Sequence, residues 1–322
     1  MKDFVNSGRR KFLKNLATTS AALAIFPRIE VLGNSAIVSA AVKQPPPGSC
    51  DFVFFTDTHI QPELDAAHGC AMAFQKIAAT KPEFAICGGD LVFDVLGVNR
   101  PRADMLYNLY KQTESQLNVP LYHAIGNHDV FGILSRTGLV TGDPLYGKKM
   151  FEDRVGARTY SSFDRKGYHF IILDSIFPTE DHQWEGRVDD AQLQWLTGDL
   201  KNVATGTPII VVVHVPLVTG FLGYSPKPTG RQKYNTYTVE NSPDVLAVFE
   251  GHNVIAALQG HLHVNETVHY KNCDFMTSGA VCGNWWHGPR MGFPEGFTVV
   301  SLREGKISTR YETYGFQSID PH

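Results

Sequence analysis

The apolar run Phe84-Ala85-Ile86-Cys87 ends in two glycines and an aspartate, Gly88-Gly89-Asp90. An unbroken apolar run that stops at a glycine turn is typical of a buried strand. The glycines let the backbone bend sharply where a side chain would obstruct it. Asp90 is therefore expected on a loop at the carboxyl end of a core strand, and in open α/β sheets ligands bind at that edge.

Four further apolar runs end in the same way. Predicted strands at 51–56, 121–125, 208–213 and 254–258 are followed by Asp57 and His59, by Asn127 and His128, by His214, and by His261 and His263, respectively. A single Asp or His at a strand end is usually a capping or surface residue. However, burying carboxylates and imidazoles at five strand ends costs desolvation free energy that is not compensated unless cations lie among them. We therefore predict a metal site where these loops converge, with Asp90 bridging two cations.

The remaining pattern favours an α/β layer architecture, because strands and helices alternate over the first part of the chain. Apolar spacing predicts helices at 65–80, 101–117 and 189–202 and a helix that closes over 245–251. A hairpin is predicted where 159–163 and 168–174 flank a turn, and further strands are predicted at 266–270, 275–278, 298–302 and 307–314. Two long connections, about 130–150 and 217–241, have the length typical of functional loops.

Length and composition exclude several classes. A chain of 322 residues can bury a large core in one domain or form two small ones. The formal net charge of −3 gives no electrostatic argument for a nucleic-acid-binding surface. The five cysteines show no CxxC spacing, which argues against a cysteine zinc site. Cys273 and Cys282 could pair if the chain is exported, and the sequence leaves this open.

The first residues are predicted to be a targeting signal. Arg9-Arg10-Lys11-Phe12-Leu13-Lys14 precedes an apolar run, 16–26, that is too short to span a bilayer and fits a signal h-region. The paired arginines resemble a twin-arginine export signal, although Gly8 stands where Ser or Thr is usual. We predict a signal peptide over 1–41 and a linker over 42–50. The Tat export machinery would then be a partner, and the mature protein would be periplasmic or secreted without a transmembrane anchor. A basic, solvated helix is the alternative.

The strand-end residues resemble the motifs of the calcineurin-like metallophosphoesterases. Asp57-x-His59, Gly89-Asp90, Gly126-Asn127-His128-Asp129, His214 and Gly260-His261-x-His263 follow one another in the order of the five blocks of that family. The resemblance covers about residues 51–314. It implies an α/β fold of four layers, a two-sheet β-sandwich flanked by helices, over residues 51–316, with 317–322 as a tail.

The resemblance also implies which residues bind metal. One ion would take Asp57, His59, Asp90 and His263, and the other would take Asp90, Asn127, His214 and His261. Such ligands suit two divalent or trivalent ions of Fe, Mn or Zn. Paired cations lower the pKa of a shared water, and the resulting hydroxide would attack phosphorus in line with the leaving alkoxide. His128 would be the general acid rather than a ligand, oriented by Asp129, for which a turn cap is the alternative.

The resulting prediction is a phosphoric ester hydrolase, either a phosphodiesterase or a phosphomonoesterase, that acts on a small-molecule substrate. One alternative is hydrolysis of pyrophosphate linkages in nucleotide or lipid intermediates. Another is a metal-binding protein of the same fold without catalysis, although no predicted ligand is missing from the motifs.

Other residues admit two interpretations each. The Gly-rich loop 283–290 either rims the substrate pocket with Trp285 or Trp286 or forms a hydrophobic lid. Three residues of the second long connection either meet a phosphate or belong to a solvated loop: Arg231, Lys233 and Tyr234. Histidines outside the motifs are predicted to be core, surface or capping residues: His68, His123, His169, His182, His252, His269 and His322.

Overall fold

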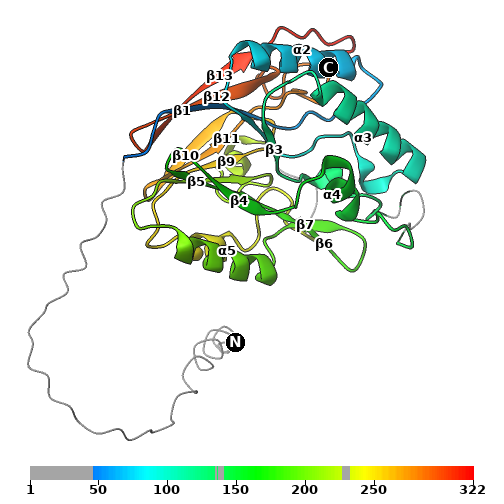
Figure 1. Ribbon diagram of the computed structural model, residues 1–322. Helices are drawn as coiled ribbons and strands as arrows, with labels where there is room; N and C mark the ends of the chain where they lie inside the picture. Colours follow the sequence, from blue (N-terminus) through cyan, green and yellow to red (C-terminus); the bar gives the residue numbers. More distant parts are fainter. Residues whose placement is uncertain (1–45, 135, 137–140, 227–232) are drawn as a thin grey trace, which may run out of the picture. The chain divides into compact units, whose positions relative to one another are not determined.

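The computed structural model describes residues 46–134, 136, 141–226 and 233–322, which belong to one compact unit, Pro45–His322 (Figure 1). The predicted signal peptide, residues 42–45 of the predicted linker and Arg231 lie outside the described residues. Within the described part of the chain, none of the helices has both the length and the apolar character needed to cross a membrane.

Two large sheets form the centre of the unit. Among the described residues, one sheet has five strands in the order β13-β12-β1-β2-β3, and the other has six in the order β10-β11-β9-β8-β5-β4. The bounds in the first sheet are β1 (Cys50–Phe55), β2 (Ala85–Cys87), β3 (Leu121–His123), β12 (Gly296–Arg303) and β13 (Lys306–Thr313). Those in the second are β4 (Ser161–Arg165), β5 (Tyr168–Leu173), β8 (Ile209–Val213), β9 (Val254–Gln259), β10 (Glu266–Tyr270) and β11 (Cys273–Thr277).

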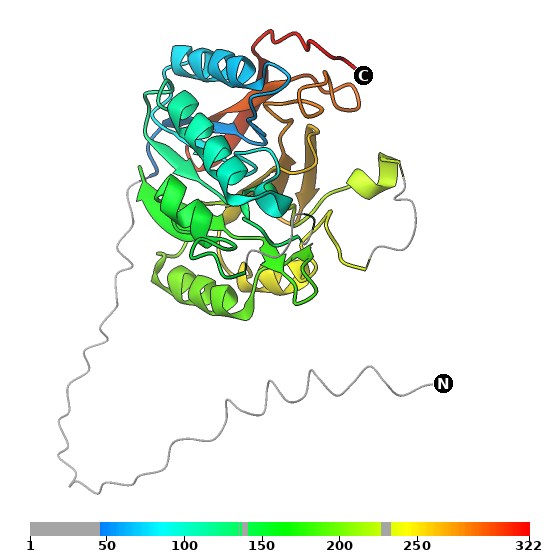
Figure 2. The same ribbon diagram turned by 90° about the vertical axis from the view of Figure 1, so that its right-hand side faces the viewer.

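Helices cover the outer faces of the two sheets, except α6, which lies on a loop that projects from them in Figure 2. Their bounds are α2 (Ala66–Ala79), α3 (Arg100–Glu114), α4 (Lys149–Val155), α5 (Asp190–Asn202), α6 (Phe221–Tyr224) and α7 (Ser242–Val248), with short 3-10 turns η1 (Val95–Gly97) and η2 (Asn127–Asp129). In Figure 1, α2 and α3 lie above the first sheet and α5 lies below the second. Figure 2 shows α7 beside α5 on that second outer face.

Strand alternation explains the layers. Phe52 and Phe54 of β1 point into an apolar cluster shared with β5, β8 and β9 between the sheets. Val53 and Phe55 point to the other face, where the ring of Phe55 contacts that of Phe74 in α2 at 5.4 Å between centroids. Because successive side chains of a strand point to opposite faces, one strand supplies two cores. The predicted fold, a two-sheet β-sandwich flanked by helices and therefore built of four layers, is thus confirmed.

Side-chain caps fix where two of the predicted helices begin. The Asn99 side chain accepts a hydrogen bond from the Arg102 backbone N–H at 3.0 Å before α3, and that of Asp189 accepts one from the Gln192 N–H at 2.8 Å before α5. Such caps satisfy backbone donors that the first helical turn leaves unpaired.

Every predicted strand and helix is present, with bounds that differ by at most a few residues. The sequence analysis did not find α4, α6 or the separate hairpin of β6 (Ile176–Pro178) and β7 (Trp184–Gly186). These elements have three to seven residues each, too few for a periodic apolar pattern to emerge.

Candidate metal centre

The predicted ligands lie at the carboxyl ends of parallel strands. Strands β1, β2 and β3 are mutually parallel, as are β8 and β9, so the loops that follow them meet at one edge of the sandwich. Backbone hydrogen bonds join these loops directly. The Asp57 N–H donates to the Gly89 carbonyl at 2.9 Å, and the Gly260 N–H donates to the His214 carbonyl at 3.0 Å.

Several ligand residues adopt left-handed backbone conformations that are uncommon for residues other than glycine. The φ angles are 56° for Asp57, 36° for His59, 53° for Asp90, 70° for His261 and 57° for His263. Each such conformation costs about 1–3 kcal/mol and persists only where the surrounding structure enforces it. Its recurrence at five predicted ligands indicates that the loops are held in place for function.

Asp90 occupies the position of a bridging carboxylate. Its Oδ2 lies 3.1 Å from Nε2 of His214 and 3.4 Å from Nε2 of His59, which belong to the two different predicted ligand sets. Its Oδ1 accepts a hydrogen bond from the backbone N–H of His128 at 2.8 Å. A Cβ atom on Gly126 would lie 2.1 Å from Oδ1 of Asp90, so this glycine permits the close approach of the two loops.

Asp57 lies on the side of the first predicted ion. Its Oδ2 accepts hydrogen bonds from Thr56 Oγ1 at 2.6 Å and from the His261 backbone N–H at 3.0 Å. Its other oxygen, Oδ1, lies 3.2 Å from Nε2 of His263, which in turn lies 3.2 Å from Nε2 of His59. These contacts leave Oδ1 of Asp57 and the two imidazole nitrogens facing one point.

Backbone carbonyls orient the histidine rings. Nδ1 of His214 lies 2.8 Å from the Gly88 carbonyl and Nδ1 of His263 lies 2.6 Å from the Gly283 carbonyl, so both rings donate there and present Nε2 to the site. His261 is reversed, because its Nε2 donates to the Thr236 carbonyl at 2.7 Å. Its Nδ1 is therefore the nitrogen available to a metal ion.

The donor set fits a pair of cations. Four buried ligand atoms have no hydrogen-bond partner among the described residues: Asp57 Oδ1, Asn127 Oδ1, His214 Nε2 and His261 Nδ1. A buried acceptor without a partner costs about 1–3 kcal/mol. Metal ions would satisfy lone pairs of this kind, which come from four of the five predicted strand-end loops, and oxygen and imidazole donors suit Fe, Mn or Zn.

Charge coupling within the site is strong. Although burial lowers the pKa of His214, the adjacent Asp90 carboxylate raises it to about 9. Burial, reinforced by the neighbouring His128 and His263 rings, lowers the pKa of His59 to about 4. Protons and metal ions therefore compete for the same nitrogen of His214.

His128 and Asp129 sit close to the ligands but differ from the prediction in one respect. Nδ1 of His128 has no hydrogen-bond partner, and the nearest carboxylate oxygen is Oδ1 of Asp94 at 3.9 Å. Asp129 is fully buried and accepts hydrogen bonds from the backbone N–H groups of Leu91, Val92 and Gly126. Its carboxylate therefore holds the two loops together and does not orient the His128 ring. This role of Asp129 is close to that of a turn cap, the alternative interpretation.

A cavity of about 360 Å³ opens beside the centre. Its walls include Asn127, His128 and His261 from the centre, the aromatic residues Trp184, Phe221, Tyr237 and Trp285, and the arginines Arg136 and Arg290. A volume and an apolar lining of this kind are typical of small-molecule sites. We therefore regard it as the substrate pocket.

The two tryptophans of loop 283–290 have different surroundings. Trp285 fits the interpretation as a pocket rim, and Trp286 fits that as a buried hydrophobic lid. Trp285 lines the pocket, with its ring centroid 4.8 Å from that of His263. Trp286 is fully buried, packs against Phe316, and donates from its indole N–H to the His59 carbonyl at 3.1 Å. Trp286 therefore supports the backbone of His59 within the centre.

Among the other open questions, that of Cys282 concerns the centre itself, because its Sγ lies 3.7 Å from Nδ1 of His263. Lys233 and Tyr234 both contact the carboxylate of Asp181 and do not line the pocket. Cys273 and Cys282 are free, buried thiols, so they do not form a disulfide. Of the histidines predicted to lie outside the site, His322 alone joins another group of possible metal ligands in the described residues, with His287 and Asp320.

Several residues beside the centre were not singled out from the sequence, among them Asp94, Arg136, Trp184 and Tyr237. Asp94 follows Asp90 by four residues, a short spacing that could have drawn attention to it. Arg290 closes the Gly-rich loop, and only the fold brings it to the pocket.

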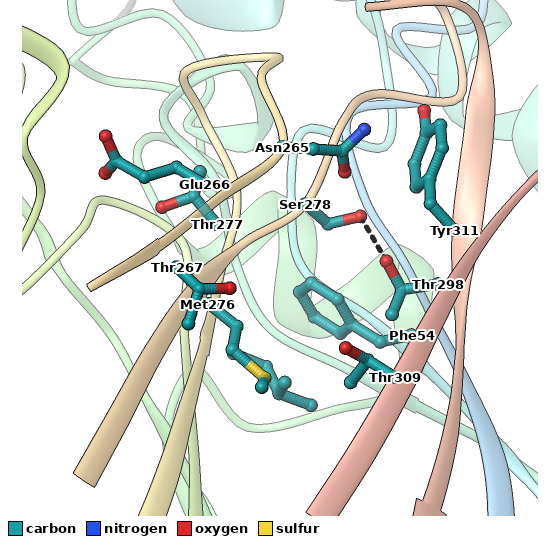
Figure 3. A pocket seen from close by; sticks show the side chains of 11 residues that line it. Phe54, Asn265, Glu266, Thr267, Met276, Thr277, Ser278, Thr298, Thr309 and Tyr311 are labelled. Atoms are coloured by element: carbon teal, nitrogen blue, oxygen red, sulfur yellow. Dashed lines mark hydrogen bonds between the residues drawn. The ribbon is translucent and has the colours of Figure 1, made fainter. Parts of the chain in front are cut away.

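A second hollow of about 230 Å³ lies between the edges of the two sheets (Figure 3). Hydroxyl groups dominate its wall, and Ser278 Oγ and Thr298 Oγ1 are joined by a hydrogen bond of 2.8 Å. None of the predicted metal ligands lines it.

Comparisons with known proteins identify the family of the chain. Residues 51–265 match the sequence profile described as calcineurin-like phosphoesterase. A protein of Rhodococcus erythropolis named "probable cyclic nucleotide phosphodiesterase" is 23% identical over 239 residues, which cover 71% of this chain and 70% of that protein.

Solved structures share the fold. A dimetal phosphatase from Danio rerio superimposes with a TM-score of 0.57 at 16% identity, covering 84% of this chain and 100% of that one. A purple acid phosphatase from yellow lupin (Lupinus luteus) seeds gives a TM-score of 0.52 at 16% identity, covering 85% of this chain and 53% of that one.

Proposed function

Because the chain belongs to the calcineurin-like phosphoesterase family, we propose that it hydrolyses phosphoric esters of small molecules at this centre, with His128 as general acid. The observation that carries the proposal is the convergence of unpartnered, buried ligand atoms from both sheets around the Asp90 carboxylate.

The predicted ligands form two sets, and His128 has a separate role. Asp57, His59 and His263 would hold one ion and Asn127, His214 and His261 the other, with Asp90 shared. When bound, such a pair supplies electrostatic stabilisation of phosphoryl oxygens and an acidified water. His128 lines the pocket beside Asn127, where an imidazolium would give its proton to the leaving oxygen.

The pocket supports an ester with a bulky, partly apolar alcohol. Trp184, Tyr237 and Trp285 supply flat surfaces, and Leu96, Leu134 and Leu262 supply aliphatic ones. An alcohol of nucleoside size suits these walls, and the relative named as a probable cyclic nucleotide phosphodiesterase supports that size class.

Activity toward two nitrophenyl esters tests the proposal. We expect the metal-loaded protein to hydrolyse p-nitrophenyl phosphate or bis(p-nitrophenyl) phosphate, to lose that activity with a chelator, and to regain it with Mn²⁺, Zn²⁺ or Fe²⁺. Stable binding of two metal ions without turnover of any ester in a phosphoester panel would instead support a non-catalytic binding protein.

We also propose that residues 1–41 direct export through the twin-arginine route to the periplasm or the exterior. The order of basic residues, apolar run and small residues supports this. A reporter fused to residues 1–50 should reach the periplasm of a Tat-competent bacterium and stay in the cytoplasm when Arg9 and Arg10 are both changed to lysine. Equal export of both fusions would contradict the route.

A further inference from the structure

Arg290 is the cation of the substrate pocket that lacks a balancing anion. Its guanidinium lies over the Trp285 ring, 5.1 Å from Cζ to the centroid, and its Nη1 donates to the Asn284 side-chain oxygen at 3.2 Å. Its Nε is buried without a hydrogen-bond partner, and among the described residues no carboxylate forms an ion pair with it. Arg136, the other arginine of the pocket, pairs instead with Asp94 at 3.1 Å.

The loop that carries Arg290 is held rigidly. Trp286 donates its indole N–H to the His59 carbonyl, and the Trp286 carbonyl accepts from Ser318 Oγ at 2.6 Å. Arg290 and Phe293 exchange two backbone hydrogen bonds of 2.9 and 2.8 Å. A side chain fixed in this way loses little entropy on binding a ligand, which strengthens each hydrogen bond that it forms.

The charges around the pocket favour a substrate with more than one negative charge. Asp57 and Asp90 are the only carboxylates among the seven predicted ligands, so two divalent cations leave the centre positive even with a bound hydroxide. Arg290 adds one more positive charge on the pocket wall. An anion bound between a half-buried guanidinium and a cationic centre is therefore favoured by both charges.

We propose that Arg290 is a specificity-determining residue that binds an anionic oxygen of the substrate, so that the pocket selects phosphoesters with at least two negative charges. This inference rests on the proposed function of the same site. The anionic oxygen belongs to a dianionic phosphoryl group. The planar donors of Arg290 suit such a group.

Two substrates with the same leaving group separate the contribution of charge. We compare kcat and KM for p-nitrophenyl phosphate, a dianion, and bis(p-nitrophenyl) phosphate, a monoanion, in the wild type and in Arg290→Met. We expect kcat/KM for the dianion to fall roughly 10- to 100-fold, the range for loss of a charged hydrogen bond, and kcat/KM for the monoanion to fall less than about fivefold.

A second readout does not depend on turnover. The affinity for inorganic phosphate, measured by calorimetry with the metal-loaded protein, should weaken by a factor similar to that for the dianion. Arg290→Lys should recover only part of both, because an ammonium cannot present a planar fork above Trp285. Arg310→Met removes an exposed arginine on β13 that pairs with Glu312 and is the matched control, expected to behave as the wild type.

The outcomes separate the two proposals. Equal losses for both esters, with normal metal content and melting temperature, would overturn the role of Arg290 and leave the hydrolase intact. Unchanged kinetics and phosphate affinity in Arg290→Met would do the same. A wild-type protein that turns over neither ester contradicts the proposed function itself, and weaker phosphate binding by the variant would then still support the anion site.

Discussion

Oδ1 of Asp94 lies 3.9 Å from Nδ1 of His128, whereas both carboxylate oxygens of Asp129, the immediate chain neighbour of His128, bind backbone N–H groups. Of these two carboxylates, that of Asp94 is therefore the one placed to influence the His128 imidazole, although Asp94 is more distant in sequence. Asp94 also pairs with Arg136, which limits the directions in which its oxygens can turn.

Asp94→Asn tests this relationship. We expect kcat to fall roughly tenfold or more for an alkyl phosphate and less for p-nitrophenyl phosphate, because nitrophenolate departs without a proton and needs no general acid. His128→Ala should show the same dependence on the leaving group, with a larger loss. Metal content, measured by mass spectrometry, should stay at the wild-type value in both variants. A uniform loss for both esters would argue that Asp94 acts only on the fold.

Asp129→Ala tests the structural role of the buried carboxylate. Three backbone donors, on Leu91, Val92 and Gly126, would lose their acceptor, and each buried unpaired donor costs about 1–3 kcal/mol. We expect the free energy of unfolding, from urea denaturation of the metal-free protein, to fall by about 3 kcal/mol or more. Asp129→Asn keeps one acceptor oxygen and should lose less. A variant as stable as the wild type would show that the loops do not depend on this residue.

Asp90→Asn should disrupt the metal pair. The amide keeps the shape and can still accept from the His128 N–H, but it removes the charge shared by the two ligand sets. We expect fewer than two ions per chain and turnover below one hundredth of the wild type. Asp51→Asn, which changes an exposed carboxylate paired with Arg303, is the control. Two bound ions and full activity in Asp90→Asn would contradict the bridging assignment.

Metal binding should depend on pH through His214. In the metal-free protein Asp90 raises the pKa of His214 to about 9, above its ordinary value of 6.5. The stability gained from this ion pair is therefore complete below pH 6.5 and is lost as the pH rises through about 9. Between these values a metal ion must displace the proton. We expect apparent metal affinity to rise with pH up to about 9 and at least one proton to be released, as measured by calorimetry in buffers of different ionisation enthalpy. Affinity independent of pH over this range would contradict the protonated state of the metal-free site.

Gly69 of α2 tests the support behind the centre. A Cβ atom here would lie 2.2 Å from Cζ3 of Trp286, whose indole binds the His59 carbonyl. We expect Gly69→Ala to lower stability by about 1–3 kcal/mol, the usual cost of overpacking, and to weaken metal binding. Gly198→Ala in α5 meets no atom within 4 Å and should instead raise stability by up to about 1 kcal/mol through helix propensity. Equal thermal shifts for the two variants would show that Trp286 adapts freely.

The order of elements and the loops that carry the candidate ligands could be predicted from the sequence because each depends on local information. An apolar run that stops at a polar residue describes a parallel strand and the loop at its carboxyl end, and parallel strands place those ends on one edge. Short elements escaped prediction because β6, β7 and α6 have three or four residues each, too few for a repeating pattern.

The sequence by itself determined that carboxylates, an amide and imidazoles would lie at the carboxyl ends of parallel strands, because chain order and strand polarity suffice for that, whereas packing of the two sheets brings the two edges together. Only the tertiary structure decided which oxygen and nitrogen atoms face the metal ions, that Asp129 holds backbone while Asp94 faces His128, and that Trp285 and Arg290 reach the pocket whereas Trp286 is buried. These choices depend on side-chain directions and on contacts between segments up to about 230 residues apart, such as the bond from Trp286 to His59. No local pattern in the chain encodes contacts of that kind.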